Sequence, residues 1–133
     1  LILQQARRFP EAIAAHREAI GMVQEAGHDF GEANGTSNMG WAYQRSGRPG
    51  DAVVHLEKAI GMARELGFRY VEAEALWGLG LARHDLGEHD AARRCWRESL
   101  DVLVGLGELT EAEAAGLMAR PVPETPQVIA QNL

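Results

Sequence analysis

Cysteine, long apolar runs and basic charge are all scarce in this sequence of 133 residues. The single cysteine, Cys95, has no partner in the chain for a disulfide, which fits a reducing compartment. No apolar run approaches the roughly 18 residues that span a bilayer, and no signal peptide is recognisable at the start. We therefore expect no membrane association and a cytoplasmic location.

The charge balance is acidic, with 13 Lys and Arg against 19 Asp and Glu and a net charge of −6. Nucleic-acid affinity depends largely on clustered Lys and Arg, so direct nucleic-acid contact by this segment is disfavoured. The length and the apolar fraction of 46% are those of one folded domain with a substantial core.

The sequence aligns with itself, without a gap, when it is shifted by forty residues. The aligned sets are Ala12, Ala52 and Ala92, then Ile20, Ile60 and Leu100, then Gly27, Gly67 and Gly107. A fixed period of this size is typical of solenoids, in which each unit buries its apolar face only by stacking on the next. We predict an all-α fold, an α-solenoid of antiparallel helix pairs.

Helical spacing and turn residues set the bounds of the repeats. We predict a repeat domain over 1–120, divided into a partial repeat (1–28), two full repeats (29–68 and 69–107) and a capping helix (108–120). Gly27 is expected to end a helix that begins near Pro10. Prolines at 121, 123 and 126 predict an extended, mobile tail over 121–133. The register places Leu1 within a helix, so we expect the chain to be a fragment of something longer.

Residues at helical spacing are expected to face the core, where small side chains let two helices approach closely. In the first helix of each full repeat they are Thr36, Met39, Gly40 and Tyr43, then Leu76, Leu79, Gly80 and Arg83. In the second helices they are Ala52, Leu56, Ala59, Ile60 and Ala63, then Ala92, Trp96, Ser99 and Leu100. The partial repeat contributes Ala12, Ile13, His16, Ala19, Ile20 and Val23.

The same positions resemble the tetratricopeptide repeat, whose first helix carries a large residue followed by Gly and then Tyr, and whose second carries Ala, a large residue and a small one. The matching residues are Met39, Gly40, Tyr43, Ala52, Leu56 and Ala59, then Leu79, Gly80, Ala92, Trp96 and Ser99, then Ala12, His16 and Ala19. The departures are Thr36, Leu76, Arg83, His16, Arg64 and Val104, and a period longer than the common 34 residues. The resemblance implies a right-handed superhelix that binds a protein or peptide without catalysis or a cofactor.

A second resemblance concerns the stretch AIGMARELGFRYVEAEALWGLGLARHDLGEHDAA. It is similar to the long-period repeats of large bacterial signalling ATPases and of SARP/AfsR-type transcriptional regulators, and the same pattern occurs in peptide-sensing regulators and adaptors. It implies that the chain is the C-terminal sensing or scaffold part of a multidomain bacterial regulator. The partner is then a protein, a peptide or a neighbouring domain of the same chain.

In such a stack the first helices line a concave groove. The residues expected there are Asn34, Ser37, Asn38, Trp41 and Arg45, then Glu74, Trp77, Gly78, Leu81 and Asp85, with Gln4 and Gln5 at one end. Asn38 occupies the position at which peptide-binding repeats of this family commonly hold a ligand backbone, and an amide both donates and accepts hydrogen bonds. Trp41 and Trp77 would be apolar anchors. The alternative is that Trp41 packs against the next unit and Asn38 is merely solvated.

Other chemistry has less support. His84, Asp85 and His89 suggest a metal site, but the histidines straddle Gly87 and a solvated turn is favoured. Arginines around Cys95 would lower its pKa, yet a half-buried structural cysteine is the simpler interpretation. We predict no catalytic and no metal-binding residues. The remaining alternative is self-association, because both ends of the stack offer incomplete faces and a homo-oligomer would cover them.

Overall fold

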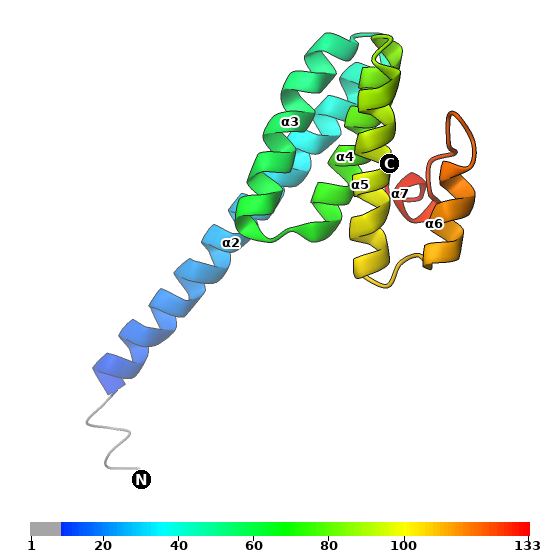
Figure 1. The fold of residues 1–133 in the computed structure, drawn as a ribbon. Coiled ribbons are helices and arrows are strands. Elements are labelled where there is room, and N and C mark those ends of the chain that lie inside the picture. The colour runs from blue at the N-terminus through cyan, green and yellow to red at the C-terminus, as the bar shows by residue number, and fades with distance from the viewer. Residues whose placement is uncertain (1–8) are drawn as a thin grey trace. The chain divides into compact units, whose positions relative to one another are not determined.

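The computed structural model describes the backbone of residues 9–133 and the side chains of residues 14, 15 and 17–133. Within this range it contains helices and no strand, which confirms the all-α fold. The helices are α2 (Phe9–Arg45), α3 (Pro49–Leu66), α4 (Arg69–Asp85), α5 (His89–Gly105), α6 (Glu111–Met118) and α7 (Gln127–Ala130) (Figure 1). No helix in the described range is both long enough and apolar enough to cross a membrane. The chain divides into two compact units, residues 1–32 and 33–133.

Glycines with positive φ lie in the turns of the second unit. Gly47, Gly67, Gly87 and Gly107 recur every twenty residues with φ between 76° and 80°. A side chain is strained in this left-handed region, so glycine is the residue that suits these turns. Gly67, which the forty-residue period aligns with Gly27, thus ends α3.

Gly27 has the same phase, but it does not end a helix. α2 runs without interruption from Phe9 to Arg45, so the predicted C-cap at Gly27 is wrong. A left-handed turn there would be stabilised by packing of the preceding helix, whereas the described side chains from Arg17 to His28 are all exposed. Continuing the helix satisfies the backbone N–H and C=O groups around Gly27 without such packing. The core positions predicted for residues 12, 13 and 16 lie outside the described side chains, and Ala19, Ile20 and Val23 are exposed.

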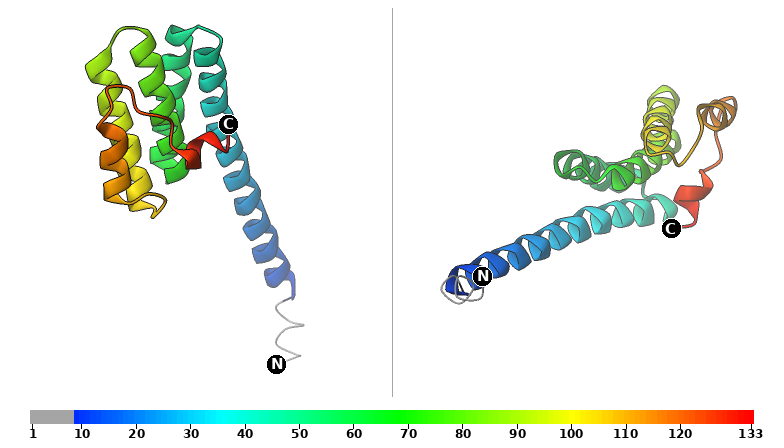
Figure 2. Two further views of the ribbon diagram at one scale, coloured as in Figure 1. Left: turned by 90° about the vertical axis from the view of Figure 1, so that its right-hand side faces the viewer. Right: turned by 90° about the horizontal axis from the view of Figure 1, so that it is seen from below.

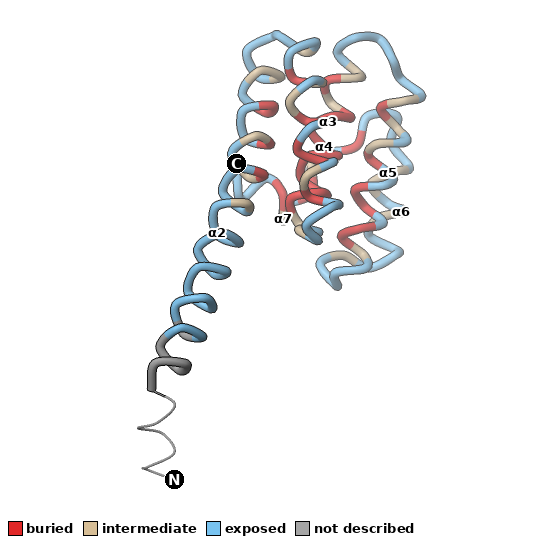
Figure 3. The backbone as a smooth tube through the Cα atoms, turned by 90° about the vertical axis from the view of Figure 1, so that its left-hand side faces the viewer, coloured by how far each residue is buried: buried red, intermediate tan, exposed pale blue. Residues whose placement is uncertain are grey.

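The core of the second unit is centred on α4, which packs against both α3 and α5. Every residue from Val71 to Gly80 is buried, as Figure 3 shows by the continuous red along α4. The positions predicted to face inward on α3 and α5 are all buried, including Trp96, which is 0% exposed. Arg83 is only half-buried and pairs with Glu57 and Glu88.

On α2, Gly40 contacts Leu56, and the Tyr43 ring lies 4.9 Å from that of His55, so this side of the helix faces α3 as predicted. Met39 was expected on the same stripe but is exposed. Adjacent residues on a helix point about 100° apart, so Met39 turns away from α3 when Gly40 faces it.

Large side chains fill the space above helical glycines. A methyl group at Gly78 would lie 2.9 Å from the indole of Trp41, and one at Gly80 would overlap the indole of Trp96. Glycine therefore allows the Trp41 ring to seat on α4, and the Trp96 ring of α5 to seat on the same helix.

The last residues do not form the extended tail that the prolines predicted. Pro126 immediately precedes α7, where a missing N–H costs nothing, and Ile129 is fully buried in the core cluster. The Arg93 guanidinium donates to the main-chain oxygens of Met118, Arg120 and Pro121 at 2.7–2.9 Å, so it caps the end of α6 and fixes the start of the segment.

We expect Gly80→Ala to lower the free energy of unfolding by about 1–3 kcal/mol, because overpacking against Trp96 outweighs the gain in helix propensity. The matched control is Gly61→Ala in α3, where an added methyl meets no atom within 4 Å. That substitution should be neutral or stabilise by up to about 1 kcal/mol. Urea denaturation measures both, and equal stabilisation by the two substitutions would contradict the packing described above.

Candidate functional site

The residues predicted to line a groove come from two helices that the structure brings together. Five lie on the second half of α2 and five on α4, all within the unit 33–133. Glu74 joins the two sets, because Ser37 Oγ donates to Glu74 Oε1 at 3.3 Å and Trp41 Nε1 donates to the Glu74 main-chain oxygen at 3.1 Å. Gln4 and Gln5, expected at one end of the groove, lie outside the described residues.

The ten residues differ in exposure. Ser37, Trp41, Glu74, Trp77 and Gly78 are buried. Asn34 and Leu81 are half-buried, and Asn38, Arg45 and Asp85 are exposed. Trp41 thus packs against Gly78 of the next repeat, which was the alternative interpretation of this residue. The surface open to a partner is therefore polar and is supplied mainly by α2.

The Glu74 carboxyl is the main electrostatic feature of this region. Burial raises the pKa of Glu74, while the hydrogen bond from Ser37 and the charge of Arg45 oppose that rise. The Arg45 guanidinium also lies 5.6 Å from the centroid of the Trp41 ring, which is cation–π distance.

Gln44 is a contact that the sequence reasoning missed. Its Nε2 donates to Asp85 Oδ2 at 3.0 Å, so a hydrogen bond joins the ends of α2 and α4. The available signal was its spacing, since Gln44 follows Ser37 by seven residues and Trp41 by three, which places the three residues on one side of a helix.

The chain's own C-terminal segment covers the α4 part of the predicted groove. Figure 2 shows residues 121–133, coloured orange to red, returning from α6 across α4. Trp77 Nε1 donates to Thr125 Oγ1 at 3.1 Å, and the Tyr70 hydroxyl donates to the Val128 main-chain oxygen at 2.7 Å. Asn132 Nδ2 donates to the same Tyr70 oxygen at 3.1 Å. The C-terminal segment therefore already occupies the part of the predicted groove at Trp77.

The structure places both groups of residues for which other chemistry was considered, the His84–His89 pair and Cys95. His84 and His89 do lie together, with their Nδ1 atoms 3.0 Å apart, but the described residues contain no group of three or more potential metal ligands. Cys95 is half-buried, and burial raises the pKa of its thiol rather than lowering it.

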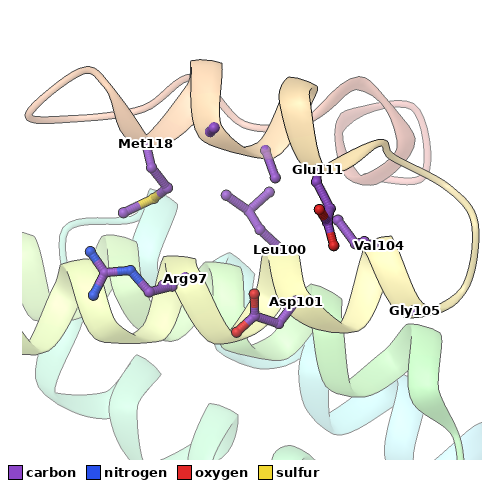
Figure 4. Close-up of a pocket in the computed structure, with 9 residues that line it drawn as sticks. Arg97, Leu100, Asp101, Val104, Gly105, Glu111 and Met118 are labelled. Carbon is purple, nitrogen blue, oxygen red and sulfur yellow. The ribbon is translucent and has the colours of Figure 1, made fainter.

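A separate cleft of about 510 Å³ lies between α5 and α6 (Figure 4). Leu100 and Met118 approach one another across it, and Arg97, Asp101 and Glu111 stand around it. The sequence reasoning did not assign this cleft. It arises because α6 is a short single helix that covers only part of α5.

Two family models match this chain. One, described as tetratricopeptide repeat, matches residues 1–65, and a second with the same description matches residues 69–98. The two matches together cover more than half of the chain and include all of α4 and most of α3 and α5. Neither a curated protein nor a solved structure matches it.

We expect the pH dependence of stability to change in Glu74→Gln. The folded-state pKa of Glu74 is raised, so the wild-type chain loses stability as pH rises from the ordinary carboxyl range through that raised pKa. A neutral amide removes this loss, and the variant should gain stability relative to wild type between about pH 4 and pH 7.5. Urea denaturation at the two pH values tests this, with exposed Glu65→Gln as control. An identical pH profile for all three chains would refute the assignment.

Proposed function

Because the chain belongs to the tetratricopeptide repeat family, whose repeats are protein–protein interaction modules, we propose that its α2–α4 face binds an extended segment of a protein partner. This family is typically a non-catalytic scaffold. We assign the chain no catalytic residue and no cofactor.

One observation supports the proposal most: exposed Asn38 stands directly beside Ser37 and Trp41, the residues that attach α2 to α4 through Glu74. The backbone of α2 is held at this point, so the amide is presented from a rigid element. An exposed amide can donate to and accept from the backbone of an extended segment, whatever its sequence. Arg45 and Asp85 add one charge of each sign at the far end of the same face.

The biological context is a further part of this proposal. The similarity of one stretch to SARP/AfsR-type repeats supports a place in the C-terminal sensing or scaffold part of a cytoplasmic bacterial transcriptional regulator. The partner is then a peptide, another protein or a neighbouring domain. The residues encoded before Leu1 test this directly. A nucleotide-binding and a DNA-binding region there supports it, and a coding sequence without them removes it.

We expect Asn38→Ala to weaken binding by about tenfold, because one or two hydrogen bonds to a ligand backbone are lost. The probes are peptides selected on the wild-type chain from a random displayed library, and their affinities are measured by calorimetry. The control is Lys58→Ala, an exposed position on α3. If Asn38→Ala and Lys58→Ala both retain wild-type affinity for every selected peptide, the binding surface lies elsewhere.

A second candidate function is self-association through the first part of α2. Ala19, Ile20, Val23 and Gln24 line a shallow groove that is almost entirely apolar. Val23 is 72% exposed, and an apolar stripe of this kind gains free energy when a second copy covers it.

Val23→Glu should therefore reduce dimerisation by at least about tenfold, because a carboxylate in an apolar contact is costly to desolvate. Met22→Glu is the matched control, since Met22 is 65% exposed but does not line the groove. Sedimentation velocity over a wide concentration range measures the dimer fraction. A wild-type chain that stays monomeric at the highest concentration excludes this function.

A further inference from the structure

Three residues of the segment that covers α4 are buried. They are Pro123, Pro126 and Ile129, while Glu124, Gln127 and Ala130 are exposed. Pro126 has φ −56° and ψ 141°, close to a polyproline II conformation, and Ile129 lies in the single helical turn α7 that follows. The segment is thus extended up to Pro126, as a bound peptide would be, and then buries one aliphatic side chain of α7.

The α4 side chains that hold the segment are donors. Trp77 offers an indole N–H to the Thr125 hydroxyl, and Tyr70 offers its hydroxyl to the Val128 main-chain oxygen. Neither donor depends on the segment being part of the same chain. Any segment with a hydroxyl residue, a proline next to it and an aliphatic residue four positions after the hydroxyl satisfies the same donors and fills the place of Ile129.

The chain connection between α6 and the C-terminal segment does not prevent the segment from leaving α4. Arg93 holds the carbonyl groups at the end of α6 and at Pro121, so that anchor lies before the docked residues begin. Within the described range, no strand pairing ties the segment beyond the anchor to a neighbour, and its hydrogen bonds to α4 are those with Tyr70 and Trp77. The segment is therefore a tethered occupant whose release leaves the α6 cap in place.

We propose that residues 121–133 are a built-in competitor for the α4 part of the groove, and that the partner segment replacing them carries the pattern Ser/Thr-Pro-x-x-aliphatic seen at Thr125–Ile129. This inference rests on the proposed function, of which it specifies the partner chemistry. Because the tether gives the internal segment a high effective concentration, it lowers the apparent affinity for the partner.

The test uses the full chain and a fluorescent synthetic peptide of residues 121–133 as the probe. Ile129→Asp undocks the internal segment without altering the α4 wall, and Val122→Asp places the same charge at an exposed position of that segment. Fluorescence anisotropy should show at least about tenfold tighter peptide binding to Ile129→Asp than to wild type or to Val122→Asp. A peptide that itself carries Ile129→Asp should not bind.

The Trp77 indole N–H resonance reports in parallel whether the internal segment is docked. An unshifted resonance in Ile129→Asp overturns the proposal, because the segment then stays docked on Trp77 without the aliphatic residue that the proposed pattern requires. A shifted resonance without peptide binding at about 1 mM also overturns it, because the segment is then a fixed part of the fold. Should Ile129→Asp unfold, Thr125→Val replaces it, with an expected gain of about threefold from the lost hydrogen bond. In one further outcome, the library-selected peptides bind in an Asn38-dependent way while the peptide of residues 121–133 does not replace the internal segment. That result leaves the proposed function intact and removes only this inference.

Discussion

The seating of tryptophan rings over helical glycines is the constraint on which the second unit depends. Trp41 lies over Gly78 and Trp96 lies against Gly80, so two large rings reach the same helix within three residues of each other. Because core side chains pack at nearly crystalline density, each ring fixes the distance and rotation of the helix that carries it. The position of the proposed binding face follows from this, since the Trp41 ring holds α2 against α4.

Polar contacts then specify the register between the two helices. Burying the Glu74 carboxyl is costly, and the hydrogen bond from Ser37 offsets part of that cost only at one relative position of the helices. The bond from Trp41 to the Glu74 main-chain oxygen satisfies the indole N–H at that same position. The consequence for function is that Asn38 and Arg45 are held on a defined face rather than on a mobile helix.

The features that could be predicted from the sequence are those set by local rules, namely helical periodicity and the conformational preference of glycine. The forty-residue period predicted a solenoid and the inward residues of α3 and α5, and the resemblance at those positions predicted the family. Gly67, which the period aligns with Gly27, does end α3, because few other residues tolerate positive φ. The predicted helix end at Gly27 was wrong because glycine permits a turn but does not require one. Packing of the neighbouring helices decides whether the chain turns there. For the same reason, the sequence could not decide whether Trp41 is buried. Spacing shows which side of α2 Trp41 occupies but not how closely α4 approaches that side.

The C-terminal segment shows the same limit most clearly. Three prolines correctly exclude a long helix, yet two of them, Pro123 and Pro126, are buried, and nothing local in the sequence distinguishes a solvated segment from a docked one. What distinguishes a docked segment from a solvated one is the surface of α4, where every residue from Val71 to Gly80 is buried. The Trp77 ring already lies 5.9 Å, centroid to centroid, from the Trp96 ring of α5, but α3 and α5 give its indole N–H no hydrogen-bond acceptor among the described contacts. The acceptor is Thr125 Oγ1, so the described chain satisfies this donor from its own end.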